Sequence, residues 1–172
     1  MNAEISIRKA ALDDAPALAE IHSRGWESAY AGIIPAETIA FKRTQRPAQW
    51  QAWVVRGDHE IYAAVLDGRL VGFVTMKQPD DHENLPSYYH EVGAIYLDPP
   101  VYRRGIGRQL MAYAEARARE LGKSALMLWV FEDNAPSRRF YEACGYARDV
   151  KGEMVENEYG HTLRSLRYVK EI

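Results

Sequence analysis

Hydrophobic residues along the chain recur with the spacings of short strands and amphipathic helices. Alternating apolar residues predict a first strand over 5–7, and apolar residues at helical spacing predict a helix over 15–29, after the acidic pair Asp13-Asp14. Pro35 begins a weaker helical stretch, and Pro47 is predicted to begin a third helix, which is rich in tryptophan. The first third of the chain is therefore predicted to be one strand followed by helices.

The middle of the chain is dominated by predicted strands. Two apolar runs, over 61–66 and 70–76, are joined by Asp67-Gly68-Arg69, and Asp-Gly is a strong turn signal between antiparallel strands. Residues 79–87 are polar and bounded by prolines, which predicts a loop, and a further strand follows over 88–97. A β-hairpin, a loop and a third strand are expected here.

The last part of the chain alternates helices and strands. One apolar helix face is predicted over 106–121, and an uninterrupted apolar run over 124–131 is typical of a strand covered on both faces. Asn134 can cap the next helix. Two further strands are predicted over 146–150 and 163–169.

This order of elements predicts an α/β fold, in the α+β sense of a mixed sheet with helices packed against it. The sequence has 172 residues, of which 47% are hydrophobic and 27% charged, and 22 basic against 24 acidic residues give a net charge of −2. That length and composition fit one globular domain over 1–172. No repeat, linker or low-complexity tract divides it.

Charge and cysteine content exclude several classes of protein. A chain this close to neutrality has no broad nucleic-acid footprint. The longest run without a charged residue, over 28–36, is too short to span a membrane, and residues 1–7 lack the pattern of an export signal, so we expect a cytoplasmic protein. The single Cys144 can form no internal disulfide and is expected to be a small buried hydrophobe.

The segment most informative about function is 102–108, where three arginines accompany two glycines between a strand and the long helix. Backbone N–H groups at a helix start attract anions, and glycine lets a phosphate approach the backbone. A Walker A loop would need a Lys-Ser or Lys-Thr after the glycines, and a Rossmann fingerprint would need a third glycine where Leu110 stands. A tight strand-to-helix connection without a ligand is the alternative.

The surroundings of this turn carry a family resemblance. The stretch 92–111, which contains Arg103-Arg104-Gly105-Ile106-Gly107-Arg108, resembles motif A of the GCN5-related N-acetyltransferases (GNAT), and 134–146 resembles their motif B, Asn-x-x-Ala/Ser-x-x-Phe-Tyr-x-x-x-Gly-Phe. The segment 26–35 is similar to the acceptor-side region of many bacterial members. One departure is Tyr102, which stands where motif A has Gln or Arg.

The resemblance implies a mixed, mostly antiparallel sheet with a splayed pair of parallel strands, which binds acetyl-CoA in the opening and needs no metal. It also implies the residues that hold this co-substrate. Backbone groups at the strand end, in Ile95, Tyr96 and Leu97, would pair with the pantetheine amides, and Asn134, the cap of the motif B helix, would reach the pantetheine arm. The diphosphate would be held by the turn, whose residues are Arg103, Arg104, Gly105, Ile106, Gly107 and Arg108. An equally good interpretation of Asn134 is that it only caps the helix.

The same resemblance implies two catalytic residues. Glu91 lies where some members place the general base that deprotonates the amine, and an ordinary solvated carboxylate is the alternative. A second base position, five residues before the motif B asparagine, is occupied here by Trp129. Tyr141 occupies the position of the general acid that protonates the CoA thiolate and would also contact the cofactor; packing on the helix face is its alternative.

The sequence indicates least about the identity of the acetyl acceptor. Trp26, Glu27 and Tyr30 are candidates for lining its pocket, with core and surface positions as their alternatives. Clustered carboxylates in the loop 80–83 are expected to be solvated, so no metal is assigned there. We expect direct acetyl transfer to a primary amine of a small molecule. The alternatives are a protein N-terminal or lysine acetyltransferase and a non-catalytic acyl-CoA-binding sensor; the resemblance is also compatible with a homodimer.

Overall fold

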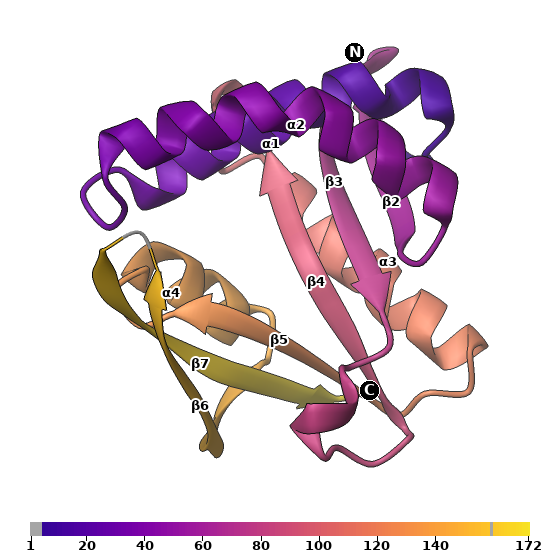
Figure 1. Ribbon diagram of the computed structural model, residues 1–172. Coiled ribbons are helices and arrows are strands. Elements are labelled where there is room, and N and C mark those ends of the chain that lie inside the picture. The colour runs from indigo at the N-terminus through magenta and orange to yellow at the C-terminus, as the bar shows by residue number, and fades with distance from the viewer. Residues whose placement is uncertain (1–4, 159) are drawn as a thin grey trace.

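The computed structural model describes residues 5–158 and 160–172 (Figure 1). In this described part, seven strands form one sheet in the order β1-β2-β3-β4-β5-β7-β6, accompanied by four α-helices. The predicted mixed sheet flanked by helices is confirmed. The elements are β1 Ile5–Lys9, α1 Ala15–Tyr30, α2 Ala36–Arg56, β2 Glu60–Leu66, β3 Arg69–Lys77, β4 Tyr89–Leu97, α3 Ile106–Glu120, β5 Ala125–Phe131, α4 Ala135–Ala143, β6 Ala147–Glu158 and β7 His161–Glu171.

The centre of the sheet is a parallel pair that comes apart. β4 and β5 pair over Tyr89–Glu91 and Ala125–Met127, and the described residues beyond these form no further β4–β5 pairs. β4 also carries an irregularity in its pairing with β3, where Thr75 pairs with Ala94 and Met76 with Val92, so that Gly93 is the extra residue of a bulge. The two strands therefore diverge as the arms of a V, which Figure 1 shows between the arrows of β4 and β5.

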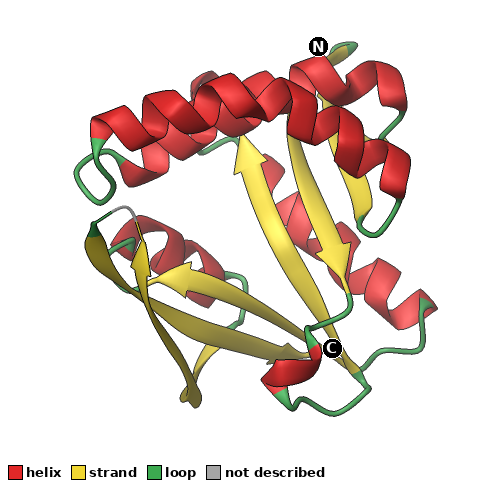
Figure 2. Cartoon of the chain, viewed as in Figure 1, coloured by secondary structure: helices red, strands yellow, loops and turns green. Residues whose placement is uncertain are grey.

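Helices cover the sheet on both faces. α1 and α2 lie side by side across the ends of β3 and β4, while α3 and α4 lie behind the sheet (Figures 1 and 2). One hydrophobic cluster joins the sheet to α3, and a second joins it to α1 and α2 around Trp50 and Phe73, both of which are fully buried. In the part of the chain that the structure describes, no helix has the length and apolarity needed to cross a bilayer.

The second helix corrects the prediction of two separate helices that begin at Pro35 and Pro47. α2 runs without interruption over Ala36–Arg56, with Pro47 inside it. An interior proline lacks an N–H and clashes with the preceding turn, which costs about 3 kcal/mol. Tertiary packing offsets this cost, because the Trp50 ring lies 4.7 Å from the Phe73 ring and its indole N–H donates to His22 Nδ1 at 3.2 Å.

Two predictions about turns and strand lengths also change. The hairpin between β2 and β3 uses only Asp67 and Gly68, with φ angles of 49° and 78°, which fits a two-residue type I′ turn rather than the predicted three residues. β6 and β7 are longer than the predicted 146–150 and 163–169. The extension in β6 is polar because this strand lies at the edge of the sheet, where side chains need not be buried.

Candidate active site

A cavity of about 810 Å³ occupies the opening between β4 and β5. Val92 and Val130 belong to the sheet face covered by α3, whereas Ala94 packs with the α1–α2 cluster on the other face. The cavity therefore passes through the gap from one face of the sheet to the other. Its lining is Gly25, Ser28, Ala29, Tyr30, Val92, Gly93, Ala94, Ile95, Tyr96, Leu97, Tyr102, Arg103, Gly105, Ile106, Gly107, Arg108, Trp129, Val130, Asn134, Pro136, Ser137, Phe140 and Tyr141.

One end of the cavity, the helix end, is formed by the turn before α3. Gly105 is the N-cap of this 15-residue helix and has a φ of 81°, a left-handed conformation that glycine adopts without strain. A Cβ at Gly107 would lie 3.1 Å from two ring atoms of Phe140, so only glycine leaves both the ring and the backbone in place. The helix end thus presents the N-terminal amides of α3 together with Arg103 and Arg108, an arrangement suited to a phosphate.

Asn134 performs the capping role and also faces the cavity. Its Oδ1 accepts the N–H of Ser137 at 3.2 Å, which confirms the predicted N-cap of α4. The residue is 3% exposed and belongs to the cavity lining. The structure therefore makes the two interpretations of Asn134 compatible, although binding to a pantetheine arm stays a prediction.

Three tyrosines meet in the middle of the cavity. The hydroxyl oxygens of Tyr30, from α1, and Tyr96, from β4, lie 3.2 Å apart, and the Tyr30 ring contacts Phe131 of β5 at 5.3 Å. Tyr30 thereby bridges the two arms of the V. Burial, and to a smaller extent the nearby Tyr30, raises the pKa of Tyr141 well above its usual value. Tyr141 therefore holds its proton at neutral pH, as a general acid must before it acts.

Glu91 is a buried carboxyl group beside the other end of the cavity, the vertex end, where β4 and β5 part at Val92–Ala94 and Trp129. It is 7% exposed, and its Oε2 lies 3.4 Å from Lys77 Nζ. Burial raises the pKa of Glu91 to about 7, although Lys77 opposes the shift. A carboxyl group with this pKa can exchange a proton near neutral pH. It does not line the cavity itself, which begins at the next residue of β4.

The structure brings most, but not all, of the expected residues together. Of the acceptor candidates, Tyr30 lines the cavity, Trp26 does not, and Glu27 lines a second hollow at the α1–α2 connection and lies 3.6 Å from Arg43.

The motif A turn is only partly at the cavity. Arg104 is exposed outside the lining, while Tyr102, the departure from motif A, lies within it. Tyr96 was expected at the site through its backbone, and the structure places its side chain at the cavity as well. Phe140 was not expected to line the cavity, because apolar residues at helical spacing resemble core residues.

The loop expected to be solvated is partly buried. The Glu83 side chain is only 6% exposed and pairs with Arg167 at 2.9 Å, so the expectation was wrong for this carboxylate. The pairing joins residues 84 apart in the chain, which no local pattern signals. Within the residues that the structure describes, no group of three or more His, Cys, Asp or Glu side chains is placed to hold a metal ion.

Comparisons with known proteins agree with this geometry. The model of the acetyltransferase (GNAT) family matches residues 17–146, which include β4, the turn, α3, β5 and α4. The chain is 26% identical over 164 residues to a spermidine N(1)-acetyltransferase of Thermoplasma acidophilum, with 90% of this chain and 98% of that protein covered. It is 27% identical over 140 residues to the peptidyl-lysine N-acetyltransferase YiaC of Escherichia coli, with 81% and 82% covered.

A solved structure supports the same likeness. PaiA N-acetyltransferase from Thermoplasma acidophilum, crystallised with coenzyme A, superposes on this chain with a TM-score of 0.74 and 25% sequence identity. The superposition covers 98% of this chain and 99% of that one. The similarity thus extends over the sheet, the V and the helices on both of its faces.

Proposed function

Because the chain belongs to the acetyltransferase (GNAT) family, we propose that it transfers an acetyl group from acetyl-CoA directly to the primary amine of a small molecule. The observation that carries this proposal is the cavity through the sheet. Its helix end is suited to a phosphate, the protonated Tyr141 lines the cavity, and the buried carboxyl group of Glu91 lies beside its vertex end. Acetyl-CoA and the amine could enter from opposite faces of the sheet and meet in the gap between β4 and β5.

The residues of the V fit acetyl-CoA. The diphosphate would bind the N-terminal amides of α3 at Gly105–Arg108, with Arg103 and Arg108 contributing salt-sensitive attraction. The β4 edge that faces away from β3 leaves backbone groups at Ile95–Leu97 without a β5 partner in the described structure. These groups would pair with the pantetheine amides, as an added strand pairs with a sheet edge.

Three proton transfers would accompany acetyl transfer. An alkylamine is protonated at neutral pH, since its pKa is about 10.4, so a base must remove a proton before attack. Glu91 would accept this proton, directly or through a water. The amine nitrogen then forms a bond to the acetyl carbon as the carbon–sulfur bond breaks, and Tyr141 would give its proton to the thiolate that leaves. The nitrogen would release its remaining extra proton to complete the amide, directly or through water, and this proton restores the Tyr141 hydroxyl.

The similarity to the spermidine acetyltransferase, which covers nearly the whole of both chains, supports a small amine as the acceptor. The second candidate is a lysine side chain in a protein, which the similarity to YiaC supports. Thiol release from acetyl-CoA should be measured over spermidine, free amino acids, a lysine peptide and a peptide with a free N-terminus. We expect a small amine to give the highest kcat/KM. A lysine peptide in that place would favour the second candidate, and no turnover with any amine would contradict both.

A further inference from the structure

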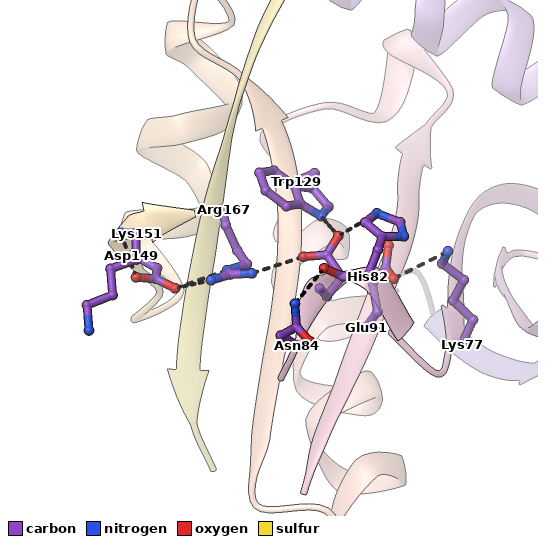
Figure 3. A network of polar contacts seen from close by, with 9 residues as sticks. Lys77, His82, Asn84, Glu91, Trp129, Asp149, Lys151 and Arg167 are labelled. Atoms are coloured by element: carbon purple, nitrogen blue, oxygen red, sulfur yellow. Dashed lines mark hydrogen bonds and ion pairs between the residues drawn. The ribbon is translucent and has the colours of Figure 1, made fainter. Parts of the chain in front are cut away.

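Glu91, Trp129 and Arg167 share one face of the sheet. Glu91 pairs with Met127 across β4 and β5, and Trp129, two residues farther along β5, pairs with Arg167 of β7. Residues opposite each other, and residues two apart on a strand, point to the same face. This is the face opposite to α3, and Figure 3 shows the three side chains together there.

The indole of Trp129 is held on its edge and on its ring face. Its Nε1–H donates to Glu83 Oε1 at 2.9 Å, and Arg167 Nη1 donates to Glu83 Oε2 at 2.9 Å. The Arg167 guanidinium also lies over the indole, 5.7 Å from the ring centroid. Asp149 fixes the guanidinium in turn, accepting from Nη2 at 2.7 Å (Figure 3). Glu83 is the member that binds both the tryptophan and the arginine.

Burial makes this arrangement costly unless its geometry is satisfied. The side chains of Glu83 and Arg167 are 6% and 10% exposed. Removing charged groups from water costs several kcal/mol per ion, and good pairing only offsets that cost. Stability alone therefore gives little reason for a carboxylate at Glu83, whereas a fixed indole at the vertex end of the cavity has a direct use.

We propose that Glu83 is a positioning residue, which holds the Trp129 indole as the wall of the vertex end and thereby sets the affinity for the amine. This inference rests on the proposed function. Trp129 and Gly93 both line the cavity beyond the last β4–β5 pair, where the amine would meet the thioester, whereas Glu83 acts only through the indole. A rotated indole would fill space that the acceptor needs while leaving the helix end unchanged.

The test is a double-mutant cycle with KM for spermidine and for a lysine peptide as the readout. Glu83→Ala removes the acceptor of the indole N–H, and Trp129→Phe removes the donor. Glu83→Gln keeps a carbonyl oxygen for the indole. Asp81→Ala, an exposed carboxylate on the same short 3-10 helix, Asp81–Glu83, is the matched control.

We expect Glu83→Ala to raise KM for the amine about tenfold, because losing a hydrogen bond to a charged group lowers the population of the held indole by about that factor or more, and apparent affinity falls with the competent fraction. KM for acetyl-CoA should stay within about twofold. Glu83→Gln should restore most of the affinity, and Glu83→Ala should have little further effect in the Trp129→Phe background. Equal losses in both backgrounds would show that Glu83 acts on stability and would overturn the proposal.

A second readout does not depend on turnover. In protein labelled with 5-fluorotryptophan, the ¹⁹F resonance of Trp129 is the one missing from Trp129→Phe. Glu83→Ala should shift or broaden it, while Asp81→Ala should leave it in place. An unchanged resonance, or an unchanged amine KM in an active enzyme, would contradict the inference. An inactive wild type would contradict the proposed function, and the resonance would still decide whether Glu83 positions the indole.

Discussion

The helix end of the cavity is assembled from one continuous segment, whereas the vertex end is assembled from several distant ones. Residues 95–108 supply the strand edge, the glycine turn and the first turn of α3. The vertex end combines Glu91 of β4, Trp129 of β5 and, behind the indole, Glu83 of the loop and Arg167 of β7. One end is mainly backbone and the other mainly side chains.

This difference explains why the two ends would respond differently to mutation. Backbone amides at a helix start bind an anion whatever the neighbouring side chains are, provided that glycine leaves room. A side-chain assembly depends on each of its contacts, because removing one partner leaves another buried and unpaired. Variants of the two ends should therefore separate cofactor affinity from catalysis.

The largest effect is expected from Tyr141, which lies between the two ends. Tyr141→Phe removes the hydroxyl and keeps the ring, so kcat should fall by about 100-fold or more while acetyl-CoA affinity changes little. Steady-state kinetics and calorimetric titration check the two halves of this prediction. Unaltered turnover would make Tyr141 a packing residue on α4.

The helix end is tested by Gly107→Val. A side chain at this position would meet the Phe140 ring, and the displaced groups would crowd the diphosphate, so Kd for acetyl-CoA should rise at least about tenfold. Calorimetry with acetyl-CoA measures the change, and circular dichroism controls for folding. A folded variant with wild-type affinity would remove this turn from the cofactor site.

Glu91→Gln tests the vertex end through pH. With the pKa of Glu91 raised to about 7, kcat/KM of the wild type should rise as pH increases through this value. The variant should lose roughly tenfold in rate at neutral pH and recover at high pH, where more of the amine arrives deprotonated. A constant fractional loss at every pH would instead indicate a structural role.

The smallest effect is a pH-dependent change in stability from the same residue. Because the folded pKa of Glu91 lies above the usual glutamate value of 4.5, the folded state binds this proton more tightly than the unfolded chain. The contribution of Glu91 protonation to the free energy of unfolding is on the order of 3 kcal/mol. It is complete below pH 4.5 and is lost as the pH rises to about 7. Denaturant unfolding should show this slope in the wild type and not in Glu91→Gln.

Much of the fold was predictable because its signals are local. The hairpin followed from Asp67-Gly68, and α4 from Asn134, whose side chain does cap the helix. The prediction of a helix break at Pro47 was wrong, because the burial of Trp50 against Phe73 compensates for the lost backbone hydrogen bond. Local propensity loses to tertiary packing where a large side chain is fully buried.

The sequence by itself determined the order of elements, the glycine turn before α3 and the family motifs at 92–111 and 134–146, since each depends on residues close together in the chain. Only the tertiary structure decided that Tyr30 and Tyr96 share a hydrogen bond, that Glu91 is buried beside Lys77 and that Glu83 holds the Trp129 indole. The physical reason is that burial and pairing depend on neighbours in space. Where β4 and β5 part at Glu91 and Met127, these neighbours come from segments that are far apart in the sequence.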